Sequence, residues 1–179
     1  MAQSIRNIVS TINTSLAGVF TGLKAYGIAY SVERDGKTQP VSNEVAVAFD
    51  DSYALQVYHK INGAQITYKP GFGDNNKTVD TFQMSAYIFN NERITKLKPD
   101  EIAMIFQSAL SLQNIISVKV LPVNIILNSP AIFNTEYRGS TYPLDEYNSL
   151  LQINYNVEVT FKSGCFDLCP EDFSPCKNN

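Results

Sequence analysis

Three cysteines near the C-terminus are the residues best suited to metal chemistry. Cys165, Cys169 and Cys176 follow a C-x3-C-x6-C pattern, whereas a structural zinc site takes four ligands and usually a C-x2-C knuckle. The only histidine, His59, lies far away in the sequence. The count and spacing argue against a metal site. Metal binding and disulfide pairing in an oxidising medium stay open as alternatives, and we expect plain thiols in a cytoplasm.

The titratable residues do not form a recognisable catalytic set. His59 continues the Leu55 and Val57 face of a predicted strand, where a lone histidine is more often a hydrogen-bonded strand residue than a base. No serine or cysteine motif accompanies it, so no triad is predicted. Carboxylates for general acid–base catalysis converge across a cleft, whereas the acidic pairs here are neighbours at turns: Asp50–Asp51, Asp145–Glu146 and Glu171–Asp172. We therefore expect no catalytic residues and no enzyme.

A glycine-rich segment, Gly71 to Thr78, has part of a phosphate-binding pattern. The dinucleotide fingerprint requires glycine at position 76, and the P-loop requires glycine directly before Lys77. Asn76 occupies that position in both comparisons. The calcium-loop pattern also fails, because Thr78 and Val79 stand where an acidic or amide side chain and then a glycine are needed. The sequence thus predicts no cofactor, nucleotide or metal ligand here.

Composition indicates one domain with an unusually neutral polar surface. The 179 residues carry a net charge of −3, and only 17% of them are charged. No run of basic residues exists that would clamp nucleic acid phosphates. A surface rich in Asn, Ser and Thr is easily desolvated and suits packing among partners, although an ordinary β-rich domain accounts for the composition too. Without a signal-peptide pattern or a long apolar run, we expect synthesis in a cytoplasm and no membrane.

The clearest element is an alternating segment from Leu151 to Phe161. Its odd positions are large and apolar, and its even positions are polar. Because strand side chains alternate between faces, this pattern predicts one long strand with a buried face and a solvated face. Such a strand requires neighbours on both edges and cover on its apolar side, so we expect the sheet to be organised around it.

Two amphipathic helices are expected to supply that cover. Apolar residues recur at steps of three and four from Ile5 to Leu23, and we expect Ser4 to be the N-cap of this helix. The second helix begins at Pro99, whose missing N–H costs nothing in a first turn, and should end near Gln113.

Shorter alternating runs predict the remaining strands. Asp35–Gly36 and Asn62–Gly63 are signals for tight turns, and the second predicts a hairpin between two short strands. Further strands are predicted at 45–49, 79–89 and 115–127. Pro122 lies inside the last one. Because proline donates no hydrogen bond to a ladder, that strand should lie at a sheet edge or contain a bulge.

Residues 128–148 are predicted to be a long irregular segment. Long loops inside compact domains are often functional, and this one carries aromatic residues and an arginine, which are favoured at interfaces. The candidate subunit-interface residues are Phe133, Tyr137, Arg138 and Tyr142, together with Asn62 and Gly63 of the predicted hairpin. The alternative is a segment that simply lies across its own domain.

The order of elements resembles that of the tail terminator and head–tail joining (neck) proteins of tailed bacteriophages. The likeness rests on the helix 4–23, the helix from Pro99, the strand 115–127 and the closing strand 151–161. It implies an α+β fold with an antiparallel (mixed) β-sheet and two helices packed on one face. We assign residues 1–164 to this single domain and residues 165–179 to a C-terminal tail. The segment 128–148 and the Cys-containing tail depart from the compact family pattern, which leaves the ring position open.

The resemblance also implies a function. Proteins of those families form rings, commonly sixfold, at the neck or at the end of the tail tube, and they have no catalytic residues. This chain would then be a virion protein that forms a homo-oligomeric ring and meets other neck or tail proteins, and DNA would pass through the lumen of the ring without specific contact. An acidic ring that does not grip phosphates suits that passage. Another tail or connector component, a non-viral β-rich interaction or ligand-binding module, and an enzyme with a site of ordinary polar residues remain alternatives.

Overall fold

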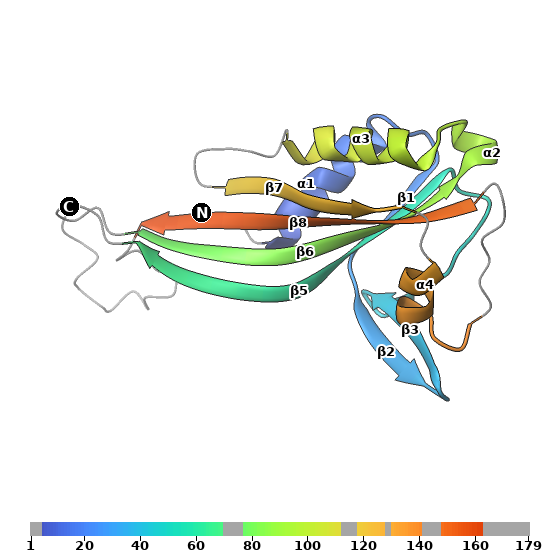
Figure 1. The fold of residues 1–179 in the computed structure, drawn as a ribbon, viewed down its shortest axis with the longest axis horizontal. Helices are drawn as coiled ribbons and strands as arrows, with labels where there is room; N and C mark the ends of the chain where they lie inside the picture. Colours follow the sequence, from blue (N-terminus) through green and yellow to red (C-terminus); the bar gives the residue numbers. More distant parts are fainter. Residues whose placement is uncertain (1–4, 70–76, 112–117, 128–129, 141–147, 163–179) are drawn as a thin grey trace.

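The computed structural model describes residues 5–69, 77–111, 118–127, 130–140 and 148–162. These residues form a five-stranded mixed sheet, a three-stranded antiparallel sheet and four helices (Figure 1). The expected α+β class is therefore confirmed. The ends of β5, β6 and β8 extend beyond the helices, while the small sheet lies near the opposite end of the large one.

The large sheet has the strand order β1-β5-β6-β8-β7. β1 pairs with β5 in parallel, and the other three pairs are antiparallel. The bounds are Leu23–Ile28 for β1, Leu55–Lys69 for β5, Lys77–Asn91 for β6, Asn148–Lys162 for β8 and Val118–Ile126 for β7. The predicted organising strand is thus β8, longer at its start than expected, with β6 and β7 on its two sides.

Two helices cover one face of this sheet, as predicted. α1 (Ile5–Ala17) packs on β1, and α3 (Pro99–Ser111) packs on β7 and β8. Between helices and sheet lies the main core, whose β8 members are the odd-numbered residues Leu151, Ile153, Tyr155, Val157 and Val159. Leu23 belongs to β1 rather than to the first helix, because the chain leaves the helix at Gly18 and turns at Gly22, which has a φ of 81°. Ser4, the predicted N-cap, lies outside the described residues.

The predicted hairpin at Asn62–Gly63 is wrong. β5 runs straight through these residues and stays paired with β6 on both sides of them, from Leu55↔Asn90 to Lys69↔Lys77. The register shifts by one residue between Ile61 and Gly63, which is a β-bulge. A two-residue type I′ turn needs positive φ at both central residues, and neither Asn62 nor Gly63 has one.

The small sheet contains the hairpin that the sequence predicts at Asp35–Gly36. β2 (Tyr30–Arg34) and β3 (Lys37–Ser42) are joined there, and the turn residues have φ values of 54° and 72°, as a type I′ turn requires. β4 is only Val45–Ala46. The predicted strand 45–49 is wrong beyond Ala46. Val47 still donates its N–H to Pro40 O at 2.9 Å, but the strand does not continue, and the side chains of Val47 and Phe49 pack in a second core.

The second core lies on the face of the large sheet opposite α1 and α3. Its members come from β5, β6, β8, the small sheet and a short helix, α4 (Pro130–Glu136). The expectation that 128–148 is irregular throughout is therefore wrong. Pro130 begins the helix α4, and the buried side chains of this helix pack in the second core. A further short helix, α2 (Glu92–Thr95), follows β6 and is capped by Asn91. No helix in the described ranges has the length and apolarity needed to cross a bilayer.

Candidate subunit interface

The second half of β5 has a free edge. β1 pairs with β5 only from Leu55 to His59, so β5 from Lys60 to Lys69 has β6 on one side and no strand on the other within the described part of the chain (Figure 1). The large side chains along this stretch are exposed, with Ile66 at 74% and Tyr68 at 57%. Unpaired N–H and C=O groups beside exposed apolar side chains make a strand edge ready to pair with another chain.

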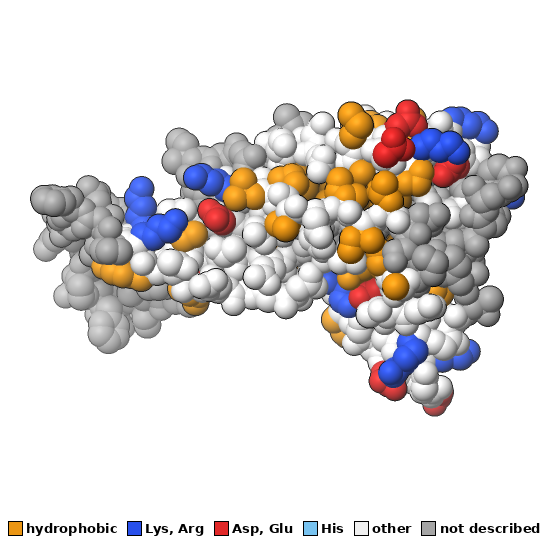
Figure 2. Space-filling view, in the orientation of Figure 1, with side chains coloured by type: hydrophobic (Ala, Val, Ile, Leu, Met, Phe, Trp, Pro, Cys, Tyr) orange, Lys and Arg blue, Asp and Glu red, His pale blue; other side chains and the backbone are white. Residues whose placement is uncertain are grey.

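The opposite margin of the sheet is formed by β7. Here too one side of the strand lacks a partner among the described residues, and the register shifts between Pro122 and Asn124. The prediction that Pro122 marks an edge or a bulge is confirmed on both counts. Hydrophobic side chains gather in a row along this margin (Figure 2). Those with large exposed fractions are Leu121, Val123, Ile126 and Leu127.

The two margins of the sheet, β7 and β5 from Lys60 to Lys69, cover largely the same stretch along the strand direction, and their bulges lie at the same place in it. Through the shared partners β8 and β6, Val118 of β7 lies level with Ile66 of β5, and Ile126 lies level with Tyr58. At the middle of this span, residues 60–63 of β5 oppose three residues of β6, and 121–124 of β7 oppose three residues of β8. Each outer strand therefore gains one residue at the same level of the sheet.

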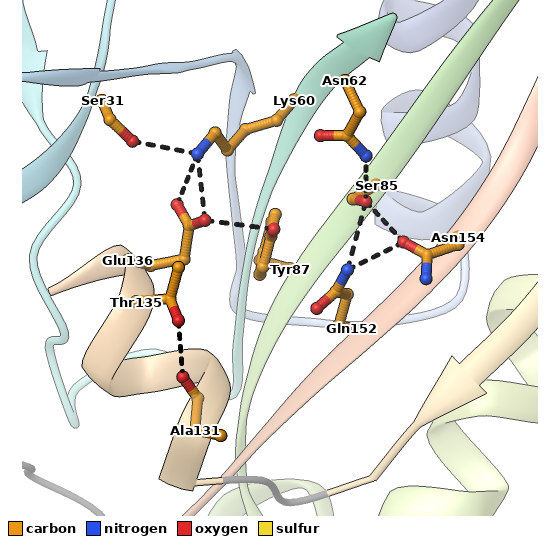
Figure 3. Close-up of polar contacts among 10 residues, drawn as sticks. All are labelled: Ser31, Lys60, Asn62, Ser85, Tyr87, Ala131, Thr135, Glu136, Gln152 and Asn154. Carbon is orange, nitrogen blue, oxygen red and sulfur yellow. Dashed lines mark hydrogen bonds and ion pairs between the residues drawn. The ribbon is translucent and has the colours of Figure 1, made fainter.

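A row of side-chain hydrogen bonds connects the two bulges across the sheet. Asn62 in the β5 bulge donates to Ser85 Oγ at 2.6 Å, and Ser85 donates to Asn154 Oδ1 (Figure 3). Asn154 then donates to Asn124 Oδ1 at 2.6 Å, beside the β7 bulge. Gln152 also donates to Asn154 Oδ1, at 2.8 Å. Neutral amides and a hydroxyl thus fix both bulges without placing a charge between them.

The face that carries this row is broad and almost uncharged. Over β5, β6 and β8, most side chains in Figure 2 are neither hydrophobic nor charged. The sequence-based expectation of a neutral polar surface thus agrees with this side of the sheet. Such a face loses little charge hydration when another protein covers it.

Two of the predicted interface residues lie inside the chain's own core. Phe133 is 2% exposed and Tyr137 is 6% exposed. Their rings stack at a centroid distance of 4.8 Å, and Tyr137 meets Phe89 of β6 edge-on at 5.7 Å. The alternative interpretation, a segment lying across its own domain, therefore describes these two aromatics.

The other predicted interface residues occupy different positions. Arg138 is exposed and forms an ion pair with Glu33 of β2 at 2.7 Å. Asn62 and Gly63 lie in the β5 bulge, at the beginning of the free edge. Tyr142 and the three cysteines lie outside the described residues. The structure thus brings Asn62 and Gly63 to an edge, whereas Arg138 follows α4 and pairs with the small sheet.

An ion pair attaches α4 to the large sheet. Lys60 Nζ lies 2.8 Å from Glu136 Oε2 and also donates to Ser31 Oγ at 2.9 Å (Figure 3). Tyr87 donates to Glu136 Oε1 at 3.2 Å. The Lys60 and Glu136 side chains are 18% and 6% exposed, so both charges are largely desolvated and depend on each other. Sequence reasoning missed this pair because the partners are far apart in the chain.

His59 is a buried structural residue, as its place on the strand predicts. It is 0% exposed, with Nδ1 2.7 Å from the Tyr155 hydroxyl and Nε2 2.9 Å from Asn13 Oδ1. Burial lowers its pKa to about 3, so the ring is neutral. Among the residues that the structure describes, no group of three or more His, Cys, Asp and Glu side chains is placed to hold a metal ion.

The residues of the two free margins were not predicted as a site. Two signals in the sequence point to them: the proline inside a predicted strand, and an apolar phase that changes from odd to even positions across Asn62–Gly63. Comparison with known proteins adds no family, since no protein-family model matches the chain and no curated protein matches it either.

Proposed function

We propose that this chain is a structural subunit of a tailed-phage virion that assembles with copies of itself into a ring at the head–tail neck or at the end of the tail tube. The observation that carries the proposal is the pair of free sheet margins, β7 and the second half of β5, which lie at matching levels of one sheet. The viral setting rests on the resemblance in element order.

The strand directions suit repeated head-to-tail contact. β5, β6, β8 and β7 alternate in direction, so β5 and β7 are antiparallel to each other. When the β7 margin of one copy meets the β5 margin of the next with both copies pointing the same way, the new pair is also antiparallel. That is the more stable kind of pairing. A contact between two different patches of this kind closes into a ring when the rotation per copy permits.

The side chains along the margins favour burial. Ile66, at 74% exposure, would gain on the order of 1–2 kcal/mol on being covered. Charge opposes the contact little, because Lys119 is the only charged residue between Val118 and Leu127. Pro122 removes one donor from β7, so it restricts which register the neighbour adopts.

The proposal is tested by the mass of the assembly. The full chain is examined by sedimentation velocity and negative-stain microscopy, alone and with its neck and tail partners. We expect closed rings. Ile66→Lys on β5 and Val123→Lys on β7 should each release monomers, because a charge at an edge disfavours pairing.

Met104→Lys is the matched control. Met104 is 67% exposed on α3 and belongs to neither edge strand, so this variant should assemble like the parent chain. A parent chain that stays monomeric at high concentration with its partners present contradicts the ring. If both edge variants still form rings, the ring itself stands, but the contact between copies is not made by β7 and the second half of β5.

A further inference from the structure

A groove lies between one face of α1 and β1, with Asn43 also in its lining. Its volume is about 500 Å³, within the range of small-molecule sites, and it is open to solvent. One wall is a face of α1 that includes Arg6, Ser10 and Asn13, and the other wall includes Gly27 and Ile28 of β1.

A directed chain of hydrogen bonds ends at Asn13 in this groove. The Asn13 side-chain oxygen only accepts, so it takes the Nε2–H of His59, which leaves His59 Nδ1 to accept from the Tyr155 hydroxyl. Each donor in this series polarises the next. The Asn13 residue is 8% exposed, and its amide NH2 has no hydrogen-bond partner within the described ranges. This series of hydrogen bonds therefore leaves the Asn13 amide as an unpaired donor that faces the groove.

A positive charge lies on the same side of α1. Arg6, Ser10 and Asn13 are four and three residues apart, so they share one helix face, and Arg6 and Asn13 are about 10 Å apart along the axis. Arg6 is in the first turn, where the helix dipole is positive and no acidic residue offsets it. No acidic side chain is among the described residues that line the groove.

We propose that this groove binds a small molecule through an anionic oxygen group, a carboxylate or a phosphate, which the Arg6 guanidinium and the Asn13 amide hold as donors. Ser10 supplies a hydroxyl between them, and Ala17 and Ile28 give the rest of the molecule apolar contact. This site does not depend on the ring, because its lining comes from one chain.

Isothermal titration of the full chain with citrate and with inorganic phosphate tests the site, and glycerol serves as the uncharged control. We expect saturable binding of one anion per chain and none of glycerol, and the tighter of the two anions identifies the class. Arg6→Gln should weaken binding about tenfold or more, as expected for the loss of a charge-assisted hydrogen bond. Ala17→Phe should abolish it by filling the groove without touching the hydrogen-bond chain.

Arg34→Gln on the small sheet is the matched control and should bind like the parent chain. Both test variants alter exposed positions, so thermal unfolding should show them folded. Absence of saturable binding at millimolar concentrations of both anions would overturn the site. So would binding that survives Ala17→Phe, which would place the anion outside the groove.

Discussion

Lowering the pH should destabilise the fold through one residue, His59. It is the only histidine in the chain, and it is fully buried between α1 and the sheet. Its neutral ring joins Tyr155 of β8 to Asn13 of α1. A proton added to this ring would create an unpaired charge in the core and would remove the acceptor that the Tyr155 hydroxyl needs.

The sign and size of the effect follow from linkage. The folded pKa, about 3, is below the unfolded value of about 6.5. Between these values the unfolded chain binds a proton that the folded chain does not, so stability falls as pH falls. From pH 7 to pH 5 the loss from this group is about 2 kcal/mol, at about 1.4 kcal/mol per pH unit once below the unfolded pKa.

Urea unfolding of the parent chain and of His59→Gln, at pH 7 and at pH 5, measures this loss. Glutamine does not titrate, so the variant should be less stable at pH 7 but should lose about 2 kcal/mol less than the parent on acidification. Tyr155→Phe is the control: it removes a partner of His59 but keeps the titrating ring, so its acid sensitivity should remain. Equal losses in the parent and His59→Gln, or a folded-state NMR titration of His59 near pH 6.5, would refute the reasoning.

Two further variants test contacts that join distant parts of the chain. Glu136→Gln should cost about 2–3 kcal/mol in urea unfolding because it leaves the Lys60 charge largely buried and unpaired, and the double variant with Lys60→Met should cost less than the two single losses together. Gly139→Ala should cost about 1–3 kcal/mol, since its φ is 78° and the new Cβ would lie 3.2 Å from Gly36 O. Gly63→Ala should change the free energy of unfolding by no more than about 1 kcal/mol, because Gly63 has no positive φ. If Gly63 were a turn residue with positive φ, the same substitution would be costly.

The sequence predicts those elements whose own residues show which face is buried, where a helix begins or where a ladder hydrogen bond is missing. The β8 alternation predicts a strand that the structure places between two neighbours, and its odd residues are buried. The Pro99 helix begins where proline and two acids predict. Pro122 predicts an edge or bulge because the missing N–H is a local property that no tertiary contact can restore.

Asn62–Gly63 shows where local patterns stop being sufficient. The apolar phase is odd up to Ile61 and even at Ile66 and Tyr68, and a slip of one residue fits a tight turn or a bulge equally well. The choice depends on β6, which continues without interruption past both halves and holds β5 in line. With the bulge, Leu55 and Ile66 lie on the same face of the sheet, so the slip keeps the apolar residues of both halves together.

The sequence does not predict α4 for the same reason: the helix depends on contacts with residues that are distant in the chain. A helix of seven residues has only about two turns, which is too short for a repeating apolar pattern to be recognised in the sequence. It exists because Phe133 stacks on Tyr137 and Tyr137 packs on Phe89, and because Lys60 neutralises Glu136. Aromatic residues in a loop predict a contact, but whether the contact is with the same chain or with another depends on which face of the sheet is left open.

The matched bulges bear on whether a head-to-tail assembly would close. A flat four-stranded unit repeated edge to edge gives an open ribbon, whereas a bulge bends its strand and increases the local twist. Here both outer strands are bulged at one level, and the Asn62–Ser85–Asn154–Asn124 row fixes that level across the sheet. Each copy would then turn by a set angle relative to the previous one, and closure depends on that angle. Closure gives one discrete mass at all concentrations in sedimentation, and a helical filament gives masses that grow with concentration, which would contradict a ring.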